Sequence, residues 1–220
     1  GGTVAQELYQ SGHDVLAIDL DEAKIQEMLG HVTVAVRADA SSETVLRELD
    51  VADFDVAVVA LGSDNVQASI LISVLLKDLG IPYIIARAAN ELHGETLERV
   101  GVDKVVFPEM ESARRAAHVG FEAGIVDYMS IVPNFGISKV HPPEEMFNRT
   151  LEELGLTNSA DNNGVAVLAI RRARSYILHP AKDEEIKPGD LLVVAGSNEQ
   201  VGRLYSMAKD LPPPVGASAS

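Results

Sequence analysis

Apolar and polar positions follow a regular rhythm through the first half of the chain. Short apolar runs such as "VAVVAL" and "YIIARA" are hydrophobic at successive positions and so on both faces of a strand. Strands are predicted at 15–19, 33–37, 56–60, 83–87 and 104–107. Helices are predicted between them at 22–29, 42–49, 64–79 and 91–100. Alternating strands and helices of this kind form a parallel, doubly wound α/β sheet.

The opening of the chain fits the end of a nucleotide-binding turn. Gly1 and Gly2 precede a helical stretch, and the next apolar run ends on Asp19. A Rossmann fold carries its Gly-rich turn after the first strand, then a helix, then a second strand that ends in an acid. We therefore predict a Rossmann-like domain whose first strand is absent from this sequence. A chance Gly-Gly is the alternative.

The pattern changes after residue 107. "PEMESARRAAHVGFEAG" predicts one long helix over 108–123, with Pro108 at its start and Gly124 at its end. Strands are predicted in "YMSIVP", "GISKV", "GVAVLAIRR", "SYILHP" and "DLLVVAG", a short helix in "TLEELGL", and a last helix at about 198–209. The predicted domains are 1–124, which includes the long helix, and 125–210, a small α+β domain. "LPPPVGASAS" predicts a disordered tail at 211–220.

Composition excludes several classes of protein. With 220 residues, 46% of them hydrophobic, and a mean hydropathy of +0.09, the chain fits a soluble globular protein. No apolar stretch approaches the roughly 20 residues of a membrane span. The net charge of −15 disfavours nucleic acid and direct lipid insertion. The absence of cysteine rules out disulfides and thiolate metal sites and favours the cytoplasm.

Two acidic residues follow strands in the first domain, at the sheet edge where ligands of open α/β sheets bind. Asp19 follows Gly1 at close to the spacing of about 20 residues that suits a ribose-binding acid, and its charge favours adenosine or NAD over NADP. The alternative is that Asp19 caps the next helix, for which Asp21 is better placed. Asp39, in "RADAS", is suited to hold the edge of an adenine through its carboxylate. A helix-capping turn explains an Asp at this position almost as well.

Three further residues stand at the ends of later strands. Gly62, in "ALGSDN", lets backbone approach a ligand closely. Arg87 ends a strand and carries a permanent charge suited to phosphate. Glu109 stands at the start of the long helix, where the helix dipole alone would explain an acid.

Catalytic groups are missing from the predicted site. His13, His31 and His93 fall in turns or at helix ends and are expected to be solvated surface residues. The sequence has no Ser-His-Asp set, no His-Glu metal helix and no Gly-Lys-Ser/Thr loop. The first domain therefore looks like a binding domain without chemistry. The long helix carries small residues beside Val119 (Ala113, Ala116 and Ala117), which favours a dimer or crossover element.

The order of these phrases resembles a known family. "LAIDLDEAK…ADAS…VAVVALGSDNVQAS…YIIARA…GVDKVVFPE" resembles the regulator-of-potassium-conductance (RCK) domain, as found in the regulatory subunits of Ktr- and Trk-type bacterial potassium uptake systems. "GVAVLAIRR" and "HPAKDEEIKPGDLLVVAG" resemble the small carboxyl-terminal RCK subdomain. The resemblance covers residues 1 to about 210, so Gly1 and Gly2 are expected to end the family's Gly-rich turn.

The resemblance implies a regulatory subunit that binds ATP, ADP or NAD(H) without turnover. Asp19 would hold the ribose, Asp39 and Ala40 the adenine and Arg87 phosphate. Glu109 would help to bind Mg²⁺ or Ca²⁺ at the γ-phosphate of ATP. The candidate nucleotide-binding residues are Gly1, Gly2, Asp19, Leu20, Asp39, Ala40, Leu61, Gly62, Asn65, Arg87 and Glu109, with Glu109 also the candidate metal ligand.

The same resemblance implies a cytoplasmic homodimer that assembles into an octameric ring under a membrane potassium channel. One RCK unit fills the chain, as in Ktr subunits, although a fragment of a tandem or channel protein fits equally. The ligand of the small domain, an ion or a cyclic dinucleotide, is left open. The alternative function is an NAD-dependent oxidoreductase.

Overall fold

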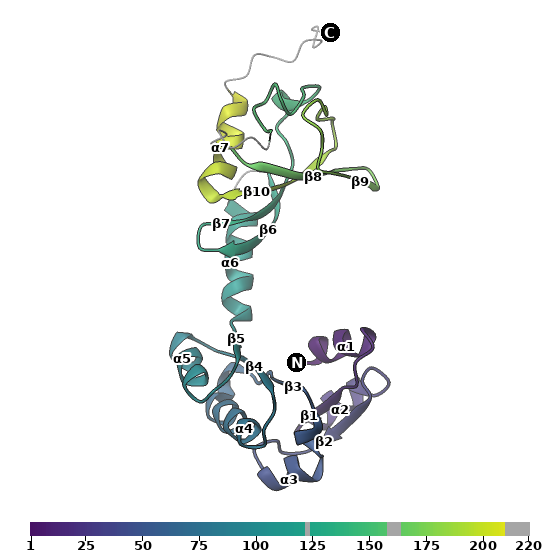
Figure 1. The fold of residues 1–220 in the computed structure, drawn as a ribbon, viewed down its shortest axis with the longest axis vertical. Helices are drawn as coiled ribbons and strands as arrows, with labels where there is room; N and C mark the ends of the chain where they lie inside the picture. Colours follow the sequence, from purple (N-terminus) through teal and green to yellow (C-terminus); the bar gives the residue numbers. More distant parts are fainter. Residues whose placement is uncertain (122–123, 158–163, 210–220) are drawn as a thin grey trace. The chain divides into compact units, whose positions relative to one another are not determined.

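The computed structural model describes residues 1–121, 124–157 and 164–209 (Figure 1). The chain forms two compact units, Gly1–Glu109 and Met110–Ser220. This division lies near the start of helix α6 (Pro108–Phe121). The sequence-based boundary at 124 counts the same helix with the first domain, and that assignment stays a prediction. The predicted tail at 211–220 lies outside the described residues.

Short parallel strands and the helices between them form the first unit, which confirms the predicted Rossmann-like α/β class. Strand β1 (Leu16–Asp19) pairs with β2 (Val34–Arg37). A second parallel sheet has the order β3 (Val56–Val59), β4 (Tyr83–Arg87) and β5 (Lys104–Val106). The helices are α1 (Gly2–Gln10), α2 (Glu22–Met28), α3 (Glu43–Glu48), α4 (Val66–Asp78) and α5 (Glu91–Arg99), with short 3₁₀ turns at Val51–Asp53 and Ser63–Asn65.

The two sheets of the first unit are not joined to each other. Among the described strands, β1 and β3 each have one edge without a hydrogen-bonded neighbour. Val56 and Val58 of β3 are 47% and 38% exposed, although strands of a parallel sheet are normally covered. In the Rossmann strand order 3-2-1-4-5-6, the first strand stands between the second and the fourth. The open edges of β1 and β3 fit this order if β1 corresponds to its second strand and β3 to its fourth.

The core of the first unit is formed by apolar side chains that its helices and strands bury against one another. Leu46 of α3, Ile84 of β4 and Leu97 of α5 are at most 1% exposed. His93 of α5 is also buried, at 5% exposure, so the expectation of a solvated surface histidine is wrong for this residue. The reason is helical periodicity, because α5 turns His93, Gly94 and Leu97 inward together.

The second unit begins with most of α6 and continues as an antiparallel sheet. Its strand order is β6 (Ile125–Val132), β7 (Phe135–Val140), β10 (Leu191–Ser197), β8 (Ala166–Arg172) and β9 (Ser175–Leu178). A 3₁₀ turn spans Glu144–Met146, and helix α7 (Asn198–Lys209) follows β10. Within the described ranges, no helix combines the length and the apolar character that crossing a membrane would require.

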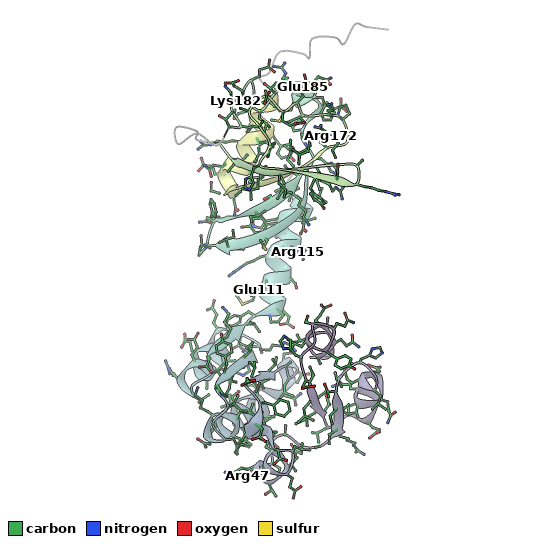
Figure 2. All side chains as sticks on the ribbon, turned by 45° about the vertical axis from the view of Figure 1, so that its right-hand side comes forward. Arg47, Glu111, Arg115, Arg172, Lys182 and Glu185 are labelled. Atoms are coloured by element: carbon green, nitrogen blue, oxygen red, sulfur yellow. The ribbon has the colours of Figure 1, made fainter. Side chains whose placement is uncertain are left out.

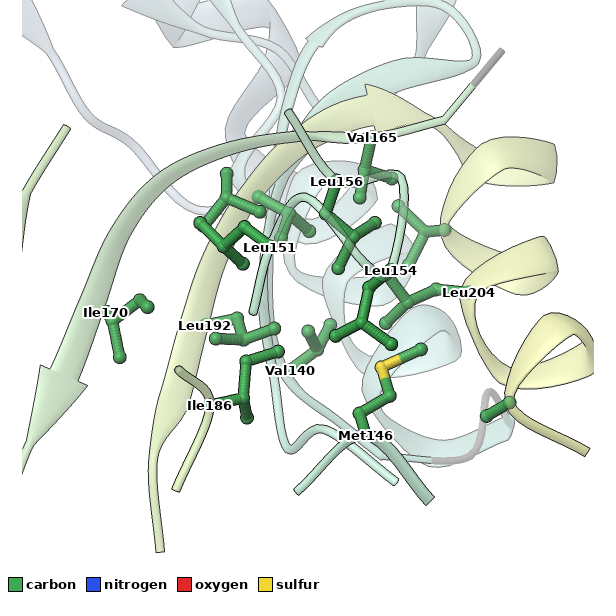
Figure 3. Close-up of a cluster of buried hydrophobic side chains, with 14 of the residues drawn as sticks. Val140, Met146, Leu151, Leu154, Leu156, Val165, Ile170, Ile186, Leu192 and Leu204 are labelled. Atoms are coloured by element: carbon green, nitrogen blue, oxygen red, sulfur yellow. The ribbon is translucent and has the colours of Figure 1, made fainter. Parts of the chain in front are cut away.

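Apolar side chains from the sheet, helix α7 and the connecting segments of the second unit meet in one core (Figure 3). Leu151, Leu154 and Leu156, from "TLEELGL", are at most 5% exposed. The short helix predicted for that segment is wrong, because residues 151–155 form turns. Gly155 ends these turns with a positive φ of 64°, and Thr150 forms an isolated bridge with Glu185. Burying three leucines within six residues is compatible with tight turns rather than with one helical face.

Candidate nucleotide-binding site

The residues predicted to bind a ligand lie at the carboxyl ends of the parallel strands. Asp19 ends β1 and Arg87 ends β4, while Leu61 and Gly62 follow β3. Glu109 is the second residue of α6, directly after β5. Parallel strands present their carboxyl ends at the same edge of a sheet, which is where ligands bind in this class of fold.

Arg87 connects three of these strand ends. Its Nη1 donates to the carbonyl oxygen of Leu61 at 3.0 Å. Its Nη2 donates to the Oε1 atom of Glu109, with which it forms an ion pair. The Arg87 side chain is 22% exposed and that of Glu109 is 63% exposed. One guanidinium therefore holds together the segment after β3, the end of β4 and the start of α6.

The amino terminus of α1 lies beside the end of β3. A Cβ built on Gly1 would stand 3.4 Å from the Cβ of Ala60. Gly1 is the N-cap of α1 and makes no side-chain capping bond, and the first turn has no acidic residue. Backbone N–H groups at such a helix start favour an anion. This end of α1 is therefore suited to a phosphate.

The glycine at position 62 is not required by backbone conformation. Its φ is −62°, a value that any residue adopts. A Cβ at this position would meet only the Nδ2 atom of Asn65, at 3.8 Å. The small residue leaves open space beside the end of β3, next to the carbonyl group that Arg87 holds.

Asp19 is held by its own loop. Its Oδ1 accepts a hydrogen bond from the Asp21 N–H at 2.9 Å, and its Oδ2 lies 3.3 Å from the Nζ of Lys24. Asp21 caps α2 by accepting from the Ala23 N–H at 2.9 Å, so Asp19 is not the helix cap. Next to it, Arg37 donates to the carbonyl oxygen of the exposed Leu20 at 3.1 Å. Sequence reasoning missed Lys24. The available signal is that Lys24 lies in the first turn of the helix that follows Asp19.

Asp39 forms a turn before α3. Its Oδ1 accepts from both the Ser41 N–H at 2.9 Å and the Ser41 hydroxyl at 2.6 Å. The hydrogen bond from the Ser41 hydroxyl, helped by that from its N–H, lowers the pKa of the Asp39 carboxyl. The turn-forming role is thus observed, and contact with adenine by Asp39 and the half-buried Ala40 stays a prediction. In the described first unit, no hydrogen bond or ion pair links Asp19 or Asp39 to Arg87 or Glu109.

Two further features bear on metal and ligand binding. No group of three or more His, Asp or Glu side chains is placed to hold a metal ion in the described part of the chain. A cation at Glu109 would therefore need further ligands that are not protein side chains, such as phosphate oxygens or water. Two apolar-lined hollows of about 170 and 130 Å³ lie in the second unit, beside Leu156. Both are smaller than the roughly 300 Å³ at which pockets for ligands of drug size begin.

Two domain families match this chain. Residues 1–108 match the TrkA-N domain and residues 137–209 match the TrkA-C domain. The first match ends at the start of α6, and the second runs from β7 to the end of α7. The first match covers nearly all of the first unit and the second covers the later part of the second unit, and residues 109–136 lie between them.

Several known proteins are similar to this chain over most of its length. The Ktr system potassium uptake protein C of Bacillus subtilis (strain 168) is 32% identical over 203 residues, which are 92% of this chain and 90% of that protein. The Ktr system potassium uptake protein A of Vibrio alginolyticus is 27% identical over 201 residues, or 91% of this chain and 90% of that protein. The crystal structure of the GsuK RCK domain has a TM-score of 0.63 at 19% identity. It aligns with 96% of this chain, which spans only 45% of the GsuK chain, and it shows the fold alone.

Proposed function

The chain belongs to the family of proteins that combine a TrkA-N domain with a TrkA-C domain, and from this membership we propose that it is a nucleotide-sensing regulatory subunit of a potassium uptake system. The observation that carries this proposal is the extent of the match to the Bacillus Ktr protein, which covers 92% of this chain and 90% of the relative. Both units are shared, so the likeness is not limited to a common nucleotide-binding fold. The resemblance to RCK proteins found in the sequence is confirmed.

The proposed ligand is an adenine nucleotide, ATP, ADP or NAD(H), at the strand ends of the first unit. Asp19, with Leu20, would hold the ribose, and Asp39, with Ala40, the adenine. The phosphates would reach Arg87 and the start of α1. Five further residues would line the path of the phosphates, because they stand at the start of α1 or beside the segment that Arg87 contacts. They are Gly1, Gly2, Leu61, Gly62 and Asn65.

Binding without turnover is part of the proposal. A dehydrogenase needs a proton donor or base beside the nicotinamide. In the described first unit, His13 and His31 are exposed and His93 is buried, with its Nδ1 accepting from the Ala89 N–H at 3.1 Å. None of the three is hydrogen-bonded to Asp19, Arg87 or Glu109. We therefore propose a sensor rather than an oxidoreductase.

A divalent cation fits beside Glu109 when ATP is bound. The carboxylate is 63% exposed and supplies hard oxygen donors, which Mg²⁺ and Ca²⁺ prefer. Mg²⁺ commonly takes one or two carboxylates and completes its shell with phosphate oxygens and water. Glu109 would hold the cation that the γ-phosphate shares, and the cation would supply positive charge between two negative groups.

The proposed assembly is a homodimer, and further an octameric ring, on the cytoplasmic side of a membrane potassium channel. Helix α6 supports the homodimer, because its small and apolar residues Ala113, Ala116, Ala117 and Val119 are all exposed. A helix with an uncovered row of small and apolar side chains is suited to close packing against a second copy.

One binding experiment tests the proposal. Calorimetric titration of the full chain with ATP, ADP and NADH is expected to show saturable binding of at least one of them. Mg²⁺ is expected to strengthen ATP binding and to change ADP binding little. The bound nucleotide should be recovered intact. Hydride transfer to a carbonyl substrate would instead establish an NAD-dependent oxidoreductase.

A further inference from the structure

The hydrogen bonds of Arg87 point to a second role for Glu109. Both terminal nitrogens of the guanidinium are engaged, Nη1 by the Leu61 carbonyl oxygen and Nη2 by the Glu109 carboxylate. A carboxylate is the side chain closest to a phosphate in charge and in the geometry with which it accepts from arginine. Arg87, the side chain suited to nucleotide phosphate, is thus already paired with an anionic group of the protein, the Glu109 carboxylate.

On this basis we propose that Glu109 is an internal competitor of phosphate for Arg87. The proposal rests on the proposed function, since it requires that Arg87 binds nucleotide phosphate. A phosphate that reaches Arg87 takes the place of the Glu109 carboxylate. Glu109 then either repels the phosphate or shares a cation with it, so its effect on affinity depends on divalent cations.

The position of Glu109 favours this role over that of a helix-start charge. An acid in the first turn of a helix is stabilised by the backbone N–H groups and needs no arginine. Here the side chain reaches back to β4, where Arg87 stands opposite Val106 of β5. Glu111, two residues further along α6, has an exposed side chain (Figure 2).

The experiment measures ADP affinity without divalent cations. ADP is titrated into the full chain in the presence of EDTA, with the wild type compared with Glu109→Gln. Glu109→Gln is expected to bind ADP up to about fivefold more tightly, since an exposed ion pair contributes up to about 1 kcal/mol. Glu111→Gln is the matched control, because it removes the same charge from the same helix and is expected to leave the affinity unchanged.

A double variant separates competition from general repulsion. In an Arg87→Gln background, measured at raised ADP concentration, Glu109→Gln is expected to give no such gain, because the pair no longer exists. The unfolding midpoint of each variant shows that it is folded. Equal affinities for Glu109→Gln and Glu111→Gln, or a gain that persists without Arg87, would overturn the competition. A wild type that binds no nucleotide at all would instead overturn the proposed function, and with it this inference.

Discussion

Asp19 is engaged by two neighbours, and both leave it available to a ribose. The Asp21 N–H occupies one lone pair of Oδ1, and Lys24 lies 3.3 Å from Oδ2. The Lys24 side chain is 63% exposed, so this pair contributes at most about 1 kcal/mol. Ribose hydroxyls can therefore displace Lys24 at little cost or bind at the remaining lone pairs.

Asp19→Ala is expected to weaken adenine nucleotide binding by about 1.5–3 kcal/mol, the usual effect of losing hydrogen bonds to a charged group. Calorimetric titration measures it. Asp21→Ala is the control, because it removes the cap of α2 and about 1 kcal/mol of stability without touching the predicted ribose contact. Equal affinities of Asp19→Ala and the wild type would remove Asp19 from the site.

The buried position of His93 predicts that the first unit loses stability in acid. Its Nδ1 accepts from the Ala89 N–H, and its Nε2 is buried with no hydrogen-bond partner in the described chain. Protonation would place a second N–H against that of Ala89, and burial lowers the pKa of His93 below its ordinary value. The folded chain thus binds fewer protons than the unfolded chain. The stability is fully present above the unfolded pKa of about 6.5 and decreases as the pH falls below it.

The free energy of unfolding is therefore expected to decrease between pH 7.5 and 5.5, by at most about 1.4 kcal/mol per pH unit from this residue. Urea unfolding at several pH values measures the slope. His93→Gln should flatten the dependence, whereas substitution of the exposed His31 by Gln should leave it as in the wild type. Parallel slopes for His93→Gln and the wild type would contradict this account.

At the scale of elements, one partly buried arginine, Arg172, fixes the loop before β10 to the end of β8 (Figure 2). Arg172 donates to Asp190 through Nε at 2.9 Å and Nη2 at 2.8 Å, to Glu184 at 2.8 Å and to the carbonyl oxygen of Glu185 at 2.8 Å. The Asp190 side chain is fully buried. Burial would by itself raise the pKa of Asp190, but the hydrogen bonds from Arg172 and from the Lys187 N–H outweigh it, so that pKa is lowered.

Asp190→Asn is expected to cost about 1–3 kcal/mol of stability, because it removes the charge from the buried acceptor of these hydrogen bonds, while Arg172 keeps Glu184 as a partner. Chemical denaturation measures the loss. The contribution of the carboxylate is present above its unfolded pKa of about 3.9 and is lost as the pH falls through the lower folded value. The exposed pair of Glu152 and Lys182 provides the control, since Glu152→Gln should cost less than about 1 kcal/mol. Equal losses in the two variants would show that the buried pair is not the stabilising contact.

The sequence predicts elements well where a pattern is local and poorly where it depends on partners. The strand Tyr83–Arg87 and the helix Asn198–Lys209 have the predicted bounds, because an apolar run or an amphipathic period defines each one. The sequence predicts a helix for "TLEELGL", but residues 151–155 form turns. Its actual turns depend on Gly155 and on the bridge to Glu185, which is remote in sequence.

The candidate site shows the same limit. The sequence places Asp19, Arg87 and Glu109 at strand ends, and the structure has them there. It could not show that Arg87 is paired with Glu109 or Asp19 with Lys24, because each pairing depends on side-chain direction. The burial of His93 was missed for a related reason, since a polar residue on the inner face of a helix breaks the expected pattern.

At the scale of the whole molecule, apolar side chains remain uncovered on the edge of the second unit's sheet. Strand β6 is an edge strand, and Met129, Ile131 and Val132 on it are 53–57% exposed. Phe135, at the start of β7, is 38% exposed. An edge strand with exposed apolar side chains tends to pair or aggregate unless another surface covers it. A second copy of the chain is the occupant that the exposed row on α6 also suits.

We therefore expect light scattering at micromolar concentration to give a mass of at least twice the 23.5 kDa of one chain. Ile131→Lys places a charge in the apolar patch and should shift the population toward monomer, because an unpaired charge opposes burial in an interface. Leu29→Lys is the matched control, since Leu29 is equally exposed at 54% but lies in the first unit, remote in sequence from α6 and β6. A stable monomer of the wild type would contradict the dimer. An effect of Leu29→Lys as large as that of Ile131→Lys would show that the contact lies elsewhere than β6.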